Sequence, residues 1–328
     1  MHKTEAEQRE GTLPGFRRAF FAYPATPHDL RQTIETAARD ASNRKSALQV
    51  DTWPAIDILG QNIADAIRRQ IDECDFVIVD ITQPNFNVYY EAGYAIGRGL
   101  PVLPVVNSAF AGATRKLQED GFFDNIKYET YQNSEQLTAI IEYFSGASLL
   151  DIYGGDPNLD QPLFLLDSYA KTDFRNSIVS AVKSAKVFYR SFDPEETPRF
   201  STVRIIADAT SSLGCIVPFL APHIDDAARH NLRASFLAGL FQGLGRPVLL
   251  TQHGDNPIPA DYRESVKAVR SPADVKEIVT TFAVESLRSV QHIRKIPARP
   301  RSATAAIRGI WLGPPRPRMS FVHSTNIS

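Results

Sequence analysis

The chain has 328 residues, of which 43% are hydrophobic and 22% charged, as in a globular protein that buries a core of its own. Its length predicts two domains. No run approaches the roughly 18 apolar residues of a membrane helix, and the polar N-terminus lacks the apolar stretch of a secretory signal. The only cysteines, Cys74 and Cys215, argue against a disulfide framework or a zinc cluster. We therefore expect a cytoplasmic protein without a membrane partner.

The net charge of −1 hides an asymmetry along the chain. Eight basic residues and no acidic one follow Glu285, so residues 1–285 carry −9. An acidic body is a poor general binder of nucleic acid, because phosphate contacts need clustered Lys and Arg. For residues 293–328 we expect a disordered basic tail rich in proline. That tail binds nucleic acid or an acidic partner in one interpretation and is merely solvated in the other.

Strand-like and helix-like segments alternate through the first half, as in a parallel sheet covered by helices on both faces. Residues 76–79 (FVIV) form a continuous apolar run, which is typical of a central strand buried on both faces. The alternation predicts a flavodoxin-like unit over residues 13–148, with ligands at the carboxyl ends of its strands. The expected strands are residues 17–23, 47–51, 76–79, 101–106 and 126–131, and the expected helices are residues 29–43, 58–74, 88–98 and 134–144.

The second half resembles the first and predicts a degenerate repeat of the same fold over residues 160–290, after a linker at residues 154–158 (GGDPN). A strand over residues 162–167 and a helix over residues 174–185 would open it. The alternative is two unrelated α/β domains. Three pairs of segments carry the similarity: FVIVDIT (76–82) with RIIADAT (204–210), YAIGRGLPVLPV (94–105) with LFQGLGRPVLLT (240–251), and residues 126–144 with residues 266–282.

This alignment matches Asp80 with Asp208 and treats residues 211–230 as an insertion. It places Leu237 opposite Glu91. The second unit would therefore lack the acidic residue that the first offers for chemistry, and we expect it to be non-catalytic, with a role in docking, dimerisation or ligand sensing.

Most of the candidate functional residues lie in residues 74–102. Asp80 ends the central strand at the lip of the sheet, and Asn87 begins the next helix, whose N-terminus is a natural site for anions. Glu91 lies one turn further along the same face. Gly93 permits close packing against the sheet or a ligand, and Tyr23 forms another wall at the same edge. Three rings are placed to flank a base or a sugar: Tyr89, Tyr90 and Tyr94.

This segment resembles the nucleoside 2-deoxyribosyltransferase and TIR-like superfamily. Members of that group carry an aspartate after the central strand and a Tyr-Glu-x-Gly-Tyr-Ala helix. Here those features are Asp80 and residues 90–95 (YEAGYA), followed by residues 99–102 (GLPV). The resemblance covers residues 13–148. It implies a flavodoxin-like fold, cleavage of N-glycosidic bonds in nucleosides or NAD-type dinucleotides, and the role of the family glutamate for Glu91.

The expected chemistry needs no metal and no cofactor, with NAD as a substrate and not as a redox carrier. Scission of a C1′–N bond builds positive charge on the ribosyl ring. Glu91 would attack C1′ or stabilise that cation, while Asp80 or Asn87, both in the predicted substrate-binding set, would hold the ribose hydroxyls. A nucleoside or dinucleotide is the expected partner, in a chain that we expect to form a homo-oligomer. The predicted substrate-binding set is completed by Tyr23, Tyr90, Gly93 and Tyr94.

Each of these residues also has a plain structural interpretation. Glu91 can be a solvated helix residue, Asp80 a loop cap and Asn87 a helix cap, while the tyrosines can belong to the core. The alternative function uses the same crevice without turnover, as a nucleotide-sensing or protein-interaction module in bacterial signalling or defence. The acidic pair Asp80 and Glu91 favours the enzyme, because a binder of phosphate would present Lys or Arg there.

Overall fold

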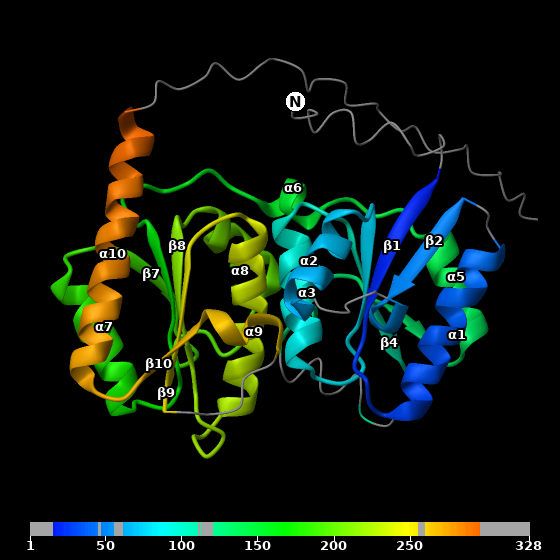
Figure 1. Ribbon diagram of the computed structural model, residues 1–328, viewed down its shortest axis with the longest axis horizontal. Helices are drawn as coiled ribbons and strands as arrows, with labels where there is room; N and C mark the ends of the chain where they lie inside the picture. The colour runs from blue at the N-terminus through cyan, green and yellow to red at the C-terminus, as the bar shows by residue number, and fades with distance from the viewer. Residues whose placement is uncertain are drawn as a thin grey trace, which may run out of the picture.

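Two five-stranded parallel sheets stand side by side, each flanked by helices (Figure 1). The structure, a computed structural model, describes residues 16–44, 47–55, 62–110, 112, 121–254 and 260–295. Of the predicted basic tail, residues 296–328 therefore lie outside the described residues. Among the helices in the described ranges, none is long and apolar enough to cross a membrane.

The first sheet has the strand order β2-β1-β3-β4-β5, with every neighbouring pair parallel. This is the flavodoxin-like order predicted from the sequence. Its strands are β1 (Arg17–Ala22), β2 (Leu48–Thr52), β3 (Phe76–Asp80), β4 (Val102–Asn107) and β5 (Glu129–Tyr131). Its helices are α1 (His28–Arg44), α2 (Ile63–Asp72), α3 (Phe86–Gly97) and α5 (Ser134–Tyr143), with a 3₁₀ turn at Trp53–Ala55.

The central strand β3 is buried along its whole length, as its apolar run predicts. Phe76 and Ile78 pack with α1 and α5 on one face of the sheet. Val77 and Val79 pack with α2 and α3 on the other face. A strand covered on both faces needs apolar residues at every position, which is why no alternation of polar side chains is seen here.

The second sheet has the order β10-β9-β8-β6-β7, which is the first order read from the opposite end. The chain therefore holds two flavodoxin-like units in tandem, as predicted. The strands are β6 (Leu163–Leu166), β7 (Tyr189–Phe192), β8 (Gly214–Phe219), β9 (Val248–His253) and β10 (Val266–Val269). The helices are α7 (Asp173–Ser184), α8 (Thr202–Thr210), α9 (Ala227–Gly243) and α10 (Pro272–Lys295); α6 (Leu149–Tyr153) precedes the linker, and a 3₁₀ turn spans Ala260–Ser265.

One part of the predicted alignment between the halves is wrong. The segment RIIADAT lies in helix α8 and is not a strand. Ile205, Ile206 and Ala209 are buried at helical spacing there, and a short apolar run of this kind fits either structure. The strand that corresponds to β3 is β8, which lies inside the segment predicted to be an insertion.

Strand register gives the correct alignment. Asp80 lies opposite Val105 of β4, and Pro218 lies opposite Thr251 of β9. Val105 and Thr251 hold the same place in the matched segments of residues 94–105 and 240–251. Pro218, and not Asp208, therefore corresponds to Asp80, and the second unit carries no carboxylate at that position.

The two units meet through backbone contact between helices α3 and α9, which lie side by side at the centre of the molecule (Figure 1). A Cβ atom built on Gly93 would lie 2.1 Å from the carbonyl oxygen of Phe236. One built on Gly239 would lie 2.0 Å from the carbonyl oxygen of Tyr90. Tyr90 matches Phe236 in the two halves, just as Gly93 matches Gly239, so the contact is reciprocal.

The same contact recurs one turn further along both helices. A Cβ atom on Gly97 would lie 2.3 Å from the carbonyl oxygen of Leu240, and one on Gly243 would lie 2.3 Å from that of Tyr94. Each helix thus carries a Gly-x-x-x-Gly pair on the face turned to its partner. Small residues at this spacing let two helix backbones approach closely enough for Cα–H···O contacts.

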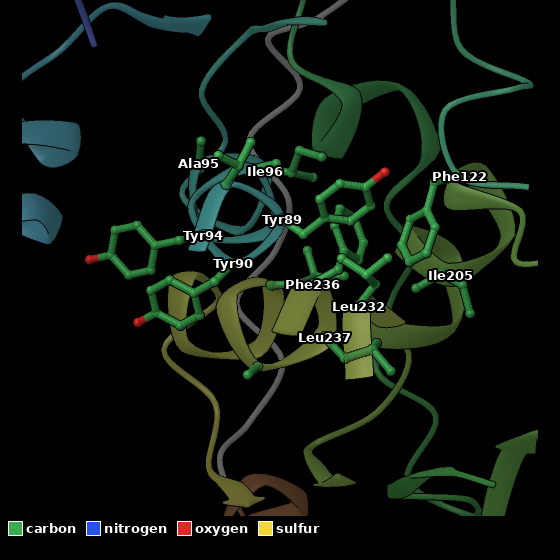
Figure 2. Packing of buried hydrophobic residues seen from close by; sticks show 14 of the residues in the cluster. Tyr89, Tyr90, Tyr94, Ala95, Ile96, Phe122, Ile205, Leu232, Phe236 and Leu237 are labelled. Carbon is green, nitrogen blue, oxygen red and sulfur yellow. The ribbon is translucent and has the colours of Figure 1, made fainter. Parts of the chain in front are cut away.

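Aromatic side chains beside the glycines join the two units into one core. The ring of Phe122 has its centroid 4.7 Å from that of Tyr89 in the first unit. It also lies 4.7 Å from Phe200 and 5.8 Å from Phe236 in the second. Figure 2 shows Tyr89 and Phe122 facing one another beside α3, with Phe236 and Leu237 of α9 below them. A single hydrophobic core therefore spans both units.

We expect Gly239→Ala to lower the free energy of unfolding by about 2 kcal/mol or more, because its methyl group would overlap the Tyr90 carbonyl and force α3 and α9 apart. The free energy lost through this overlap should exceed the gain of about 1 kcal/mol that the higher helix propensity of alanine brings over glycine. Urea denaturation followed by circular dichroism measures it. The matched control is Gly155→Ala, whose added methyl would meet its nearest atom, Ser211 Oγ, at 3.5 Å. A Gly239→Ala protein as stable as wild type would contradict the backbone contact.

Candidate functional site

The carboxyl edge of the first sheet gathers polar residues from several strands. Tyr23 follows β1, Asp80 ends β3 and Asn107 ends β4, while Asn87 lies in the first turn of α3. Because the strands are parallel, their carboxyl ends meet at one edge, which is where ligands bind in sheets of this order. The predicted juxtaposition of Asp80 with the start of α3 follows from this topology.

The Asp80 carboxylate is fully buried and is held by three donors from the protein. One oxygen accepts the Thr82 backbone N–H at 3.0 Å. The other accepts the Thr82 hydroxyl at 3.1 Å and the Tyr131 phenol at 2.6 Å. The Thr82 hydroxyl in turn accepts the Asn107 N–H at 2.8 Å. Asp80 thus ties together the ends of three adjacent strands, and it could hold a ribose hydroxyl only by exchanging one of these bonds.

Burial also governs the charge of this carboxylate. Desolvation raises the pKa of Asp80 to about 6, against the opposing effect of its hydrogen bonds from Tyr131 and Thr82. Desolvation and the neighbouring Asp80 carboxylate likewise raise the pKa of Tyr131 far above its usual range, so this phenol remains a donor.

The N-terminus of α3 differs from the prediction. The N-cap is Asn85, whose side-chain oxygen accepts the N–H groups of Asn87 and Val88 at 3.0 and 3.2 Å. Those two amides are therefore occupied, and the expected anion site there is not open. Asn87 is not the cap. Its side-chain oxygen is buried and has no hydrogen-bond partner in the structure, so this acceptor could receive a hydrogen bond from a ligand.

Glu91 lies one turn after Asn87, and its side chain is only 5% exposed. At 100° per residue it stands about 160° around the helix from Gly93, which faces α9. Ala95, one turn beyond Glu91, lies on the side of α3 away from α9 in Figure 2. Glu91 therefore belongs to the side of α3 that is turned from the second unit, and it is not a solvated helix residue. A carboxylate at this degree of burial is uncommon and is typical of functional or paired groups.

The remaining motif residues contact the neighbouring helices α2 and α9. Gly93 packs on the α9 backbone, as described above. The Tyr90 hydroxyl donates to Gln242 of α9 and accepts from Arg68 of α2 at 2.9 Å. The Tyr94 hydroxyl donates to Asp72 at 3.1 Å, and burial together with that carboxylate raises the pKa of Tyr94 to about 12. These residues have clear structural roles, and their contact with a substrate stays a prediction.

Tyr23 is buried at the end of β1, with 4% of its surface exposed. Its hydroxyl donates to Glu35 Oε1 at 3.0 Å. Burial, together with that carboxylate, raises the pKa of Tyr23. The side chain therefore serves the core on the α1 face of the sheet, and the backbone that follows it forms part of the carboxyl edge.

Sequence reasoning missed three residues that shape this edge: Thr82, Asn85 and Tyr131. The first two had a local signal, because Asp-x-Thr and an Asn before a helix are common turn and capping patterns. Tyr131 had none, since its bond to Asp80 joins residues 51 positions apart through the register of β4 and β5.

No protein-family model matches the sequence, and no curated protein matches it. Within the described ranges, no group of three or more His, Cys, Asp or Glu side chains is placed to hold a metal ion.

We expect Asp80→Asn to remove a pH dependence of stability. The folded pKa of about 6 lies above the ordinary aspartate value of 3.8, so Asp80 favours the folded state most below about pH 4, and this contribution falls as pH rises towards 6. Two pKa units correspond to about 3 kcal/mol. Asparagine fits the same partners, since its oxygen can accept the Thr82 N–H and its amide can donate to the two hydroxyls.

Urea denaturation at several pH values between 4 and 7 measures this effect. The stability of wild type relative to Asp80→Asn should fall between pH 4 and 6 and stay constant above 6.5. The control is Asp29→Asn, whose side chain is 95% exposed. Parallel pH profiles for wild type and Asp80→Asn would show that Asp80 does not titrate in this way.

Proposed function

We propose that the chain cleaves, or transfers at, the N-glycosidic bond of a nucleoside or an NAD-type nucleotide, with Glu91 as the nucleophile or the stabiliser of the ribosyl cation. The observation that carries this proposal is the burial of the Glu91 carboxylate on the side of α3 away from α9, one turn from Asn87. The resemblance of the YEAGYA helix to the deoxyribosyltransferase and TIR-like group supports the same assignment.

A carboxylate with little exposure suits this chemistry. Charge interactions are stronger where water is excluded, so a buried anion stabilises a developing oxocarbenium ion more than a solvated one would. It needs no reorganisation of solvent as the positive charge appears at C1′. Either role, covalent attack or electrostatic stabilisation, is open to a glutamate at this position.

Asn87 supplies the second element of the proposed site. Its side-chain oxygen is an acceptor without a donor, and a ribose hydroxyl is a donor of the right kind. Asp80 would act beside it, either on the ribose after giving up a bond from Thr82 or Tyr131, or by fixing the loop that leads into α3. Tyr23 would contribute through the backbone at the same edge.

The compartment and the assembly belong to the same proposal. Cys74 and Cys215 are both buried and free, which suits a reducing compartment, and we assign the protein to the cytoplasm. A homo-oligomer stays our expectation for its state of assembly.

A second function, a non-catalytic module that senses nucleotides or binds proteins, is favoured by one observation. Three residues of the YEAGYA helix serve packing between helices: Gly93 on α9, Tyr90 on Gln242, and Tyr94 on Asp72. A helix of this composition can thus be explained by its packing against α2 of the same unit and α9 of the other. The two functions differ in whether Glu91 takes part in catalysis in addition to any structural role.

Glu91→Gln tests the enzyme directly. The substitution keeps size and hydrogen bonding while it removes the charge, so we expect the rate of base release to fall by about 10²–10³-fold, and further if Glu91 is the nucleophile. The assay incubates the protein with NAD and a panel of nucleosides and separates the released base by liquid chromatography. The matched control is Glu277→Gln, an exposed glutamate on α10, which should keep the wild-type rate.

Binding separates the two functions. The bound ground state carries little charge at C1′, so Glu91→Gln should change substrate affinity much less than rate. Wild-type protein that binds NAD or a nucleoside and releases no base would establish the sensing module instead. A Glu91→Gln protein that turns over at the wild-type rate would remove Glu91 from the mechanism.

A further inference from the structure

The second unit has a cavity of about 430 Å³ at the carboxyl edge of its own sheet. Five parts of the unit line it: Phe219 at the end of β8, the loop of residues 220–224 after it, His253 at the end of β9, the start of α7 around Phe174, and the start of α10 around Val275. It therefore occupies the place where sheets of this order bind ligands, and its volume lies in the range of small-molecule sites.

The lining is mainly apolar, with polar groups at the rim. Phe174 and Phe219 supply aromatic surface, and Ile224 supplies an aliphatic wall. His223 and His253 are exposed, so their ring nitrogens can reach the edge of a bound molecule. The rings of Phe174 and His253 lie 5.8 Å apart at an angle of 31°, which gives a ring-lined corner for a flat ligand.

The charges of the described residues around the cavity favour a ligand without a phosphate. Among the described residues that line it, Asp173 carries the only formal charge, and neither Lys nor Arg is present. Side chains also cap the nearby helices: Thr172 accepts the Arg175 N–H of α7, and Asp274 accepts the N–H groups of Arg270 and Ser271 before α10. These bonds take up part of the donor capacity that the start of each helix would otherwise offer to an anion.

The cavity wall is built by a segment that the first unit lacks. Asp80 and Pro218 are 138 positions apart, whereas Gly93 and Gly239 are 146 apart, so the second copy has eight more residues between its central strand and its glycine helix. They lengthen the helix, which has 17 residues in α9 and 12 in α3, and the loop before it. That loop supplies Ala221 to the cavity, together with the residues Leu220, His223 and Ile224.

Side chains of α9 hold this loop in place. Asn231 accepts the Leu220 N–H at 2.9 Å and donates to the Leu220 carbonyl at 2.9 Å. The buried ring of His230 contacts the Pro218 carbonyl oxygen, with 2.7 Å between Nε2 and O, and burial lowers the pKa of His230 to about 4. At neutral pH this imidazole is therefore uncharged and donates to that carbonyl. The wall is thus fixed before any ligand arrives, which lowers the entropy cost of binding.

We propose that this cavity binds a neutral, flat heterocycle, namely a free nucleobase or a nucleoside without a phosphate. Aromatic and aliphatic walls take the faces of such a ring, and the two rim histidines offer a donor or an acceptor to its polar edge. The site belongs to the second unit and is separate from Glu91, so the proposal does not depend on catalysis in the first.

Titration calorimetry of the whole chain with adenine, adenosine and AMP tests the proposal. Adenine and adenosine should bind with Kd on the order of 0.1–1 mM, as expected for ligands of this size, and AMP more weakly. Ala221→Trp places a large side chain in the cavity wall and should abolish this binding. His253→Ala removes an exposed ring and should weaken it by about three- to tenfold.

Two matched variants control for nonspecific effects: Ala147→Trp, at an exposed loop position outside the cavity, and His28→Ala, whose ring is exposed in the first unit. Both should bind as wild type does. Adenine and adenosine that fail to bind at millimolar concentration would overturn the proposal. So would binding that survives Ala221→Trp and His253→Ala unchanged, or AMP that binds as tightly as adenosine.

The same titrations in Glu91→Gln protein separate this proposal from the proposed function. Binding that Ala221→Trp removes should persist when Glu91 is changed. If wild type releases no base yet binds adenine in this manner, the enzyme proposal fails and the cavity proposal stands. If base release depends on Glu91 and no adenine binding responds to Ala221→Trp, the reverse holds.

Discussion

The backbone contact between α3 and α9 is the constraint on which the rest of the structure depends. The Cα atoms of Gly93 and Gly239 lie so close to backbone carbonyls of the opposite helix that no side chain would fit there. These two glycines therefore determine how closely the units approach. That approach brings the rings of Phe122, Phe200 and Phe236 into one cluster. The close approach also covers one side of α3 with α9, and Glu91 lies on the other side. The arrangement of the two units, their common core and the surroundings of the candidate site therefore all depend on the contact between α3 and α9.

Much of the fold could be predicted from local sequence. The wrong prediction for one segment has a clear physical cause. The FVIV strand was recognisable because burial on both faces demands an unbroken apolar run. RIIADAT satisfied the same test, yet it forms α8, because a short apolar stretch also fits one buried face of a helix. The GLPV and GRPV turns were the safer guide, since a positive φ at Gly99 and at Gly245 restricts the residue type.

The candidate site could be predicted only in part, because its residues act across long separations in the chain. Glu91 and Asn87 share a helix face by spacing alone, and that expectation needs nothing beyond helical geometry. The bond between Asp80 and Tyr131 depends on strand register, and the role of Gly93 depends on a helix 146 residues away. A sequence shows that such residues are unusual, but their partners come from the assembled fold.

The shared core has a consequence for the linker at residues 154–158. Phe122 and Phe123 of the first unit are buried against the Phe236 ring of the second, so neither half can leave without exposing a large apolar surface. Covalent continuity is thus not what keeps the halves together. A protease that cuts the linker of the folded protein would yield two fragments that still migrate as one particle, in the manner of a heterodimer whose subunits happen to share a single chain.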